Sequence, residues 1–136
     1  IQTFENLGSS GWAHQLRYET KDGQQFFVKT SRKSAAKMFV GEALGLEALG
    51  AAQAVRVPQV LHCADDGMGG SYIVMEYLDL KGRPRDMYAF GQAVGRMHKA
   101  TPLSEEARGG RFGFAVDNTI GGTPQPNTWT DSWVEF

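Results

Sequence analysis

Lys29 and Glu42 are the two side chains of this sequence whose types and places could hold a phosphate group. Lys29 ends a strand-forming run, Phe26-Phe27-Val28, and an ammonium is a compact charge that binds phosphate oxygens well. Glu42 falls beside the apolar stripe of the next segment, where an unpaired carboxylate would be costly. An ion pair between them would explain both positions and would aim the ammonium at a nucleoside triphosphate. Either residue alone would be an ordinary solvated charge, as we interpret Lys33, Lys37 and Glu47.

A short segment before this strand combines small residues that let a phosphate approach the backbone. Its residues are Gly8, Ser9, Ser10 and Gly11, which we expect to form a turn whose N–H groups cover the phosphates. A Gly-Ser turn between two strands is common, so the segment gives only weak support by itself. It is not a Walker A loop, because no G-K-[ST] follows it. The later run Gly67-Met68-Gly69-Gly70 precedes a strand instead of opening a helix, so it is no dinucleotide fingerprint.

A second apolar strand, Ser71 to Tyr77, runs into polar sequence and could present backbone groups to a purine. We expect the carbonyl and N–H groups at its end to pair with the edge of adenine. The residues concerned are Met75, Glu76, Tyr77 and Leu78. Many plain strands end in the same way, and the position of this one after Lys29 and Glu42 favours the functional interpretation.

The elements that must position these residues follow from the periodicity of the apolar side chains. We expect two or three strands in residues 4–30, with a hairpin turn at Lys21-Asp22-Gly23. Helical spacing runs from Ser34, the expected N-cap, to an end near Gly50. A short strand at 59–62 and the strand at 71–77 follow. Asp86 is expected to cap a helix that ends near Lys99, and an ordered loop is expected from Arg108 onward.

This order of elements predicts an α+β fold in which an antiparallel sheet carries one packed helix on a face. That is the architecture of a protein-kinase-like small lobe. We expect residues 1–80 to be the ATP-binding small lobe. Residues 81–136 would be a linker at 81–85, a first helix and an aromatic loop, which begin a mostly helical and incomplete large lobe.

Composition narrows the possible partners. The 136 residues carry 14 basic and 15 acidic side chains, so the net charge of -1 gives no reason to expect nucleic acid or an anionic membrane. We see neither a signal peptide nor an apolar run of membrane-spanning length. The one cysteine, Cys63, cannot form an internal disulfide, which fits a reducing, cytoplasmic compartment. His62, Cys63, Asp65 and Asp66 match no compact zinc pattern, so we expect no metal site there.

Several stretches of the chain resemble the N-terminal part of the fructosamine kinases, also called ketosamine 3-kinases. The most specific is residues 112–133, FGFAVDNTIGGTPQPNTWTDSW. The others recur more widely among aminoglycoside-phosphotransferase-like kinases, and they are FVKT at 27–30, MFVGEALGLEAL at 38–49, VPQVL at 57–61, SYIVMEYL at 71–78 and GRMH at 95–98. The resemblance covers essentially the whole chain but only about the first half of a family member.

The resemblance implies a two-lobed enzyme that uses ATP and Mg²⁺ to phosphorylate the sugar 3-hydroxyl of glycated amines, which links it to protein deglycation. Lys29 and Glu42 match the family's phosphate-positioning pair, and residues 76–78 match its adenine hinge. The segment around Gln125 and Asn127 lies toward the catalytic face, without an assigned role. The catalytic-loop aspartate and the Mg²⁺ ligands that follow it do not occur in this sequence. We therefore assign no catalytic residue here and expect the chain alone to be inactive.

Two other functions stay open at this point. An aminoglycoside- or choline-type kinase would share the fold, although residues 112–133 argue against it. A non-catalytic nucleotide-binding or interaction module would work without a catalytic loop. The start at Ile1 and the aromatic end suggest a cut chain. A cut chain should leave Trp129, Trp133 and Phe136 exposed and prone to self-association, whereas a complete module should bury them.

Overall fold

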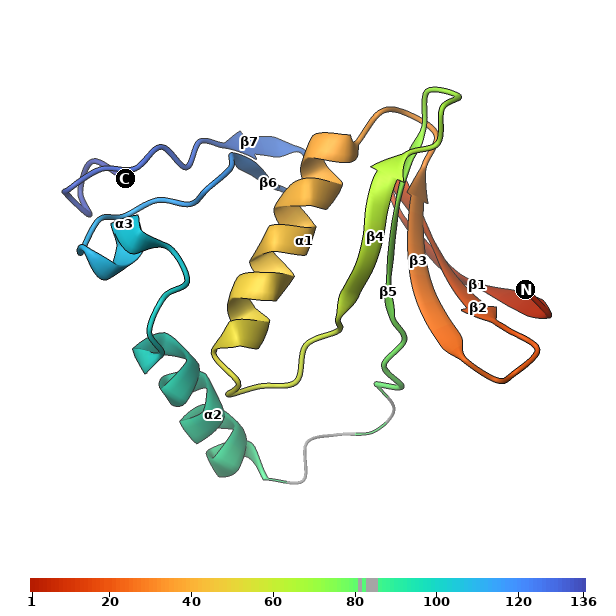
Figure 1. The fold of residues 1–136 in the computed structure, drawn as a ribbon, viewed down its shortest axis with the longest axis horizontal. Coiled ribbons are helices and arrows are strands. Elements are labelled where there is room, and N and C mark those ends of the chain that lie inside the picture. Colours follow the sequence, from red (N-terminus) through yellow and green to blue (C-terminus); the bar gives the residue numbers. More distant parts are fainter. Residues whose placement is uncertain (81, 83–85) are drawn as a thin grey trace. The chain divides into compact units, whose positions relative to one another are not determined.

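The computed structural model describes residues 1–80, 82 and 86–136, and its helices and strands are shown in Figure 1. The predicted linker at 81–85 lies outside the described residues except for Gly82. The elements are β1 (Thr3–Ser10), β2 (Ala13–Glu19), β3 (Gln25–Ser31), α1 (Ala36–Ala51), β4 (Val60–Asp65), β5 (Ser71–Glu76), α2 (Met87–Lys99), α3 (Glu105–Arg108), β6 (Asn118–Ile120) and β7 (Thr123–Gln125). Within these described residues, none of the helices has the length and apolar character of a membrane span.

The chain divides into two compact units, which we describe separately. One comprises Ile1–Leu46 with Pro58–Gly82, and the other comprises Glu47–Val57 with Arg83–Phe136. The first unit contains a five-stranded antiparallel sheet in the order β1-β2-β3-β5-β4. This confirms the predicted antiparallel sheet. The Lys21-Asp22-Gly23 turn is also confirmed, because Gly23 has a positive φ of 81° and its N–H donates to the Thr20 carbonyl at 3.0 Å.

The predicted turn at residues 8–11 is wrong in its position. Gly8, Ser9 and Ser10 belong to β1, and the turn is made by Gly11 and Trp12. The positive φ of Gly8, 126°, serves a register shift between Asn6 and Gly8 inside the strand, and the ladder then continues to Ser10 opposite Ala13. A bulge of this kind uses a glycine without ending the pairing, which local sequence cannot distinguish from a turn.

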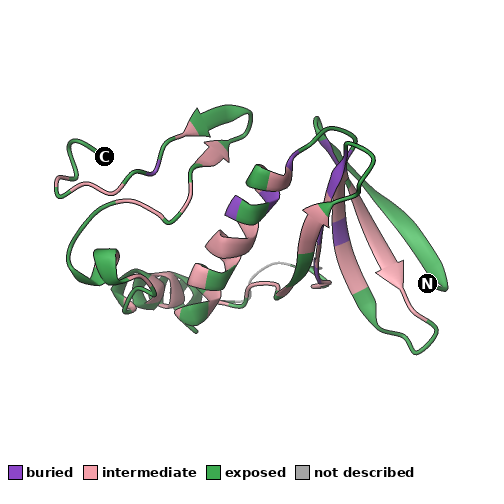
Figure 2. Cartoon of the chain, turned by 45° about the horizontal axis from the view of Figure 1, so that its top comes forward, coloured by how far each residue is buried: buried purple, intermediate pink, exposed green. Residues whose placement is uncertain are grey.

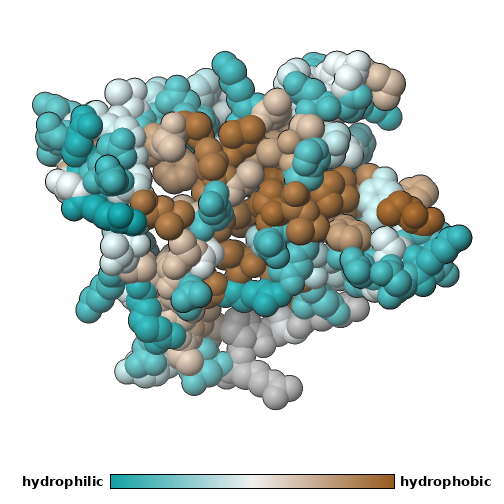
Figure 3. Space-filling model, in the orientation of Figure 1, coloured by the Kyte–Doolittle hydropathy of each residue, from teal (hydrophilic) through white to brown (hydrophobic). Residues whose placement is uncertain are grey.

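One face of the sheet is covered by the N-terminal part of α1. Lys29 pairs with Ile73 and Phe27 with Met75 across β3 and β5, so these four side chains share that face. The core forms there from Ala35, Phe39, Ile73 and Met75, with Phe27 and residues 38, 43 and 46 of α1 packed against it. Figure 2 shows buried residues on these inner strands and at the start of α1, whereas β1 is exposed along its whole length. Apolar surface also follows α1 in Figure 3.

The start of α1 is held by a serine from the sheet. The helix begins at Ala36, so Ser34 is not its N-cap, and the amide that precedes the helix, Ala35 N–H, donates to Ser71 Oγ at 2.9 Å. The Ser71 hydroxyl in turn donates to Asp65 at 2.6 Å. Because Ser71 is almost fully buried, each of its hydrogen bonds replaces one that water would make.

The second unit is built from short elements and loops. Asp86 caps α2 as predicted, since its carboxylate accepts the Ala89 N–H at 2.9 Å. The short helix α3 ends at Arg108. The region after it, predicted to be a loop, also contains the β6–β7 hairpin. Trp133 is 68% exposed, but Trp129 is half-buried because Gly113 lies directly against its ring. The exposure expected for Trp129 is therefore wrong.

We predict that Ser71→Ala destabilises the first unit by about 1–2 kcal/mol, because it leaves the Ala35 N–H without its buried acceptor. The measurement is the free energy of unfolding in urea. Ser9→Ala, a change at an exposed serine of β1, is the matched control and should be close to neutral. Equal losses for the two variants would contradict the capping role.

Candidate functional site

Lys29 and Glu42 form the predicted ion pair. Lys29 Nζ lies 2.5 Å from Glu42 Oε1, joining β3 to α1 across the helix-covered face of the sheet. Their side chains are 23% and 28% exposed, so the pair is partly shielded while its edge remains open to solvent. An ammonium held in this way is oriented by a hydrogen-bonded carboxylate and still has further N–H donors to offer.

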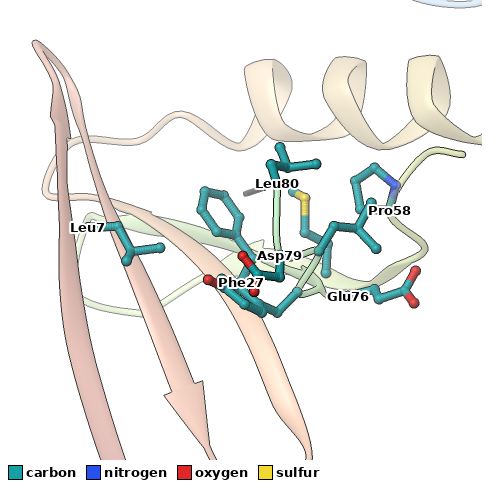
Figure 4. Close-up of a pocket in the computed structure, with 9 residues that line it drawn as sticks. Leu7, Phe27, Pro58, Glu76, Asp79 and Leu80 are labelled. Atoms are coloured by element: carbon teal, nitrogen blue, oxygen red, sulfur yellow. The ribbon is translucent and has the colours of Figure 1, made fainter. Parts of the chain in front are cut away.

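The same unit contains an apolar pocket of about 380 Å³. Its size falls in the range of small-molecule sites. It is lined by Leu7, Phe27, Pro58, Met75, Glu76, Tyr77, Leu78, Asp79 and Leu80. In Figure 4, Phe27 stands near the centre, Leu7 approaches from β1, Pro58 lies on the opposite side, and Leu80 lies between Phe27 and the helix. Phe27, which lines the pocket, precedes Lys29 by two residues, so the two side chains project from the same face of β3.

The structure brings the four residues predicted to form a hinge to this pocket, with different roles for backbone and side chain. Met75 is buried in the core as well as lining the pocket. The Glu76 N–H donates to the Gln59 carbonyl at 2.8 Å, so that group belongs to the sheet. The Glu76 carboxylate points away from the apolar side chains in Figure 4. Tyr77 and Leu78, beyond the end of β5, continue along the pocket.

Arg17 was not singled out in the sequence, yet it fixes one of the pocket residues. Its guanidinium lies 5.4 Å from the centre of the Tyr77 ring and 2.9 Å from the Glu5 carboxylate. The pKa of Arg17 is raised, chiefly by its hydrogen bond with the Tyr77 side chain and less by the charge of Glu5. Arg17 pairs with Phe27 across β2 and β3, so the alternation of strand residues was the signal that could have placed it near the pocket.

The glycine–serine segment reaches the site through its two ends. Leu7, just before Gly8, lines the pocket. At the other end, the Trp12 ring packs on Phe39 of α1, with ring centroids 5.5 Å apart. Gly8, Ser9, Ser10 and Gly11 are all exposed, and the Gly8 N–H donates to Asn6 Oδ1 at 2.9 Å. The sequence analysis does not single out Trp12. Its large aromatic side chain, next to the glycine–serine segment, is the only feature of the sequence that could have drawn attention to it.

Asn127, which had no assigned role, is a structural residue of the second unit. It is buried, and its side-chain amide donates to the Val116 carbonyl at 3.0 Å. Its own N–H donates to Asp117 Oδ1 at 2.8 Å, and its carbonyl accepts the Phe114 N–H at 3.0 Å. Asn127 therefore ties residues 114–117 to the segment that follows the hairpin. Gln125, at the end of β7, is half-buried.

Metal ligands do not gather in the described part of the chain. Across residues 1–80, 82 and 86–136, no group of three or more His, Cys, Asp or Glu side chains could hold an ion. Cys63 is half-buried and unpaired in β4. Asp66 Oδ1 accepts the N–H groups of Met68 and Gly70, which makes it a turn residue.

Comparison with known proteins gives a consistent set of relatives. The model of the fructosamine kinase family matches residues 1–136. A chloroplastic protein-ribulosamine 3-kinase of Arabidopsis thaliana is 46% identical over 119 residues, covering 88% of this chain and 35% of the relative. A ketosamine-3-kinase of Mus musculus is 32% identical, covering 88% of this chain and 44% of the relative. The chain thus spans less than half the length of these relatives.

Solved structures agree with the fold. A crystal structure of a "putative fructosamine-3-kinase" from Haemophilus somnus has a TM-score of 0.81 at 26% identity, covering all of this chain and 44% of that one. A protein described in the same words from Thermobifida fusca has a TM-score of 0.76 at 34% identity, covering 98% of this chain and 44% of that one. These likenesses confirm the predicted α+β, protein-kinase-like fold.

We predict that Asn127→Ala loosens residues 114–117, because the Val116 carbonyl loses its side-chain donor. Hydrogen exchange read by mass spectrometry should show faster exchange in this segment. The control, Gln125→Ala, removes a neighbouring amide and should leave the exchange there unchanged. Similar protection in both variants would show that Asn127 does not hold the loop.

Proposed function

We propose that this chain, which belongs to the fructosamine kinase family, is the ATP-binding part of a ketosamine kinase. The observation that supports this most directly is the Lys29–Glu42 pair, whose lysine follows the pocket residue Phe27 by two positions on the same face of β3. A nucleoside triphosphate needs a flat apolar slot for its base and a positioned cation for its phosphates. The first unit offers both, and Phe27 and Lys29 of β3 contribute to them from the same face of the sheet.

In this proposal the pocket holds adenine. Leu7 and Phe27 supply apolar contact to the faces of the ring, and backbone groups of residues 76–78 pair with its edge. Lys29 binds the α and β phosphates, and Glu42 keeps the ammonium in place. The exposed segment Gly8, Ser9, Ser10 and Gly11 lies over the phosphates, where its small side chains let a phosphate group come close to the backbone.

The substrate class follows from the relatives, which are named for ribulosamine and ketosamine. In the whole protein, phosphate would pass from ATP to the sugar 3-hydroxyl of a glycated amine. Mg²⁺ would neutralise charge on the phosphates, and its carboxylate ligands and the base for the hydroxyl would come from the part of the family's length that this chain does not span. The residues described here bind and orient the nucleotide, and none is assigned a catalytic role.

The first test is Lys29→Met. We expect it to weaken ATP binding by roughly ten- to hundredfold, because a charge-assisted contact to phosphate is lost. In the whole protein it should also abolish phosphorylation of a ribulosyl- or fructosyl-amine. Binding is measured by calorimetry and transfer by phosphate incorporation. Lys37→Met, on the exposed side of α1, is the matched control and should change neither quantity. Unchanged ATP affinity in Lys29→Met would overturn the proposal.

The second test separates the base from the phosphates. Leu7→Ala should weaken adenosine and ATP binding alike, by roughly three- to tenfold, because it removes apolar area from the pocket wall. Lys29→Met should weaken ATP binding and leave adenosine binding unchanged. Leu61→Ala, an exposed leucine of β4 outside the pocket lining, should affect neither ligand. If Leu7→Ala weakened only ATP, the pocket would not be the adenine site.

A further inference from the structure

Trp12 is an unusual residue for the place it occupies. It forms the tip of the β1–β2 hairpin with Gly11, whose φ of 64° is the left-handed conformation that glycine favours. The Trp12 N–H donates to the Ser10 carbonyl at 2.6 Å, which closes the turn tightly. Such positions are usually filled by small or polar residues, because turn tips project into solvent. A tryptophan here needs another reason.

That reason is a contact with the helix that carries Glu42. The Trp12 and Phe39 rings lie 5.5 Å apart with their planes inclined at 42°, a favourable arrangement for an aromatic pair. Phe39 is completely buried, whereas Trp12 is 39% exposed, so the indole covers the ring from the solvent side. Ala13, directly after the tip, is also buried. The hairpin tip is therefore seated on α1 and is not a free flap.

The seat lies one helical turn from the phosphate pair. Phe39 and Glu42 are three residues apart on α1, so they share a face of the helix. The path from hairpin to ammonium is a set of described contacts: Trp12 on Phe39, the turn of helix between Phe39 and Glu42, and Glu42 on Lys29. Phe39 is packed in the core, where side chains are in close contact. A displacement of Trp12 is therefore passed through Phe39 to the helix.

We propose that Trp12 is a positioning residue that links the hairpin over the phosphates to the orientation of Glu42, and hence of Lys29. This inference rests on the proposed ATP-binding function. When the hairpin is seated, α1 holds Glu42 against Lys29 and the ammonium is ready for the phosphates. When the tip lifts, α1 loses the contact that covers Phe39 and the pair becomes less well held. ATP, by binding both the hairpin and Lys29, would favour the seated arrangement.

A double-mutant cycle tests the link. Trp12→Ala should weaken ATP binding by roughly three- to tenfold, the loss expected for one aromatic pair. If Trp12 acts through Glu42, the same change made in a Glu42→Gln background should cost less than about twofold, because the two losses are not additive for coupled residues. Trp12→Phe keeps an aromatic ring at the tip and should restore most of the affinity. The ATP affinities of the unchanged chain, of Trp12→Ala, of Glu42→Gln and of the double variant are measured by calorimetry and complete the cycle.

The matched control is Phe4→Ala. Phe4 packs on Tyr18 with ring centroids 5.9 Å apart. The substitution therefore removes a similar ring pair from the opposite end of the same hairpin. Its effect on ATP affinity should be less than about twofold and additive with Glu42→Gln. Hydrogen exchange without nucleotide gives a second measurement: Trp12→Ala should speed exchange in residues 39–42, and Phe4→Ala should not.

The possible outcomes separate this inference from the proposed function. If Lys29→Met leaves ATP affinity unchanged, the proposed function is wrong and the inference falls with it. If Lys29→Met and Glu42→Gln weaken binding while Trp12→Ala is additive with Glu42→Gln, ATP binding stands and the link through Trp12 is wrong. Unchanged exchange in residues 39–42 of Trp12→Ala would overturn the link as well.

Discussion

The ion pair between Lys29 on β3 and Glu42 on α1 is the contact on which the site depends. A partly exposed pair of this kind contributes little to stability, because solvent screens it and both side chains lose conformational freedom. The role of the ion pair is to orient the Lys29 ammonium, because the free lysine side chain would otherwise sample many rotamers. The pair forms only if α1 lies on the sheet in one rotation, and the packing of Phe39 against Ile73 and Met75 sets that rotation. Hydrophobic burial thus supplies the free energy, and the ion pair uses the geometry that results.

The site divides its tasks along a single strand. Phe27 forms part of the apolar wall and Lys29, two residues later, carries the charge, because alternate residues of a strand project from the same face. The opposite wall comes from the end of β5 and the residues that follow it. Arg17 steadies Tyr77 from β2 through its ring contact and its bond to Glu5. An apolar surface and a charged side chain therefore lie within one unit of the fold.

Sequence reasoning succeeded where the signal was local and strong. Alternation and the Asp-Gly turn located the inner strands, helical spacing located α1, and the cost of an unpaired carboxylate predicted the partner of Lys29. It failed where a short element depends on contacts made elsewhere. The β6–β7 hairpin has weak propensity and lies next to a segment tied by Asn127 to residues 114–117. Gly8 was assigned to a turn, although its positive φ serves a bulge within β1.

The sequence by itself determined the inner strands and the helix of the first unit, the residues that could bind a triphosphate, and the family, whose motifs are contiguous and readable along the chain. Only the tertiary structure decided which distant residues share a surface. Leu7 and Pro58 meet at one pocket, and Trp12 reaches Phe39, because strand register and helix rotation bring them together. The physical reason is that periodicity gives the face of each element, whereas register and packing arise from many weak contacts between segments far apart in the chain.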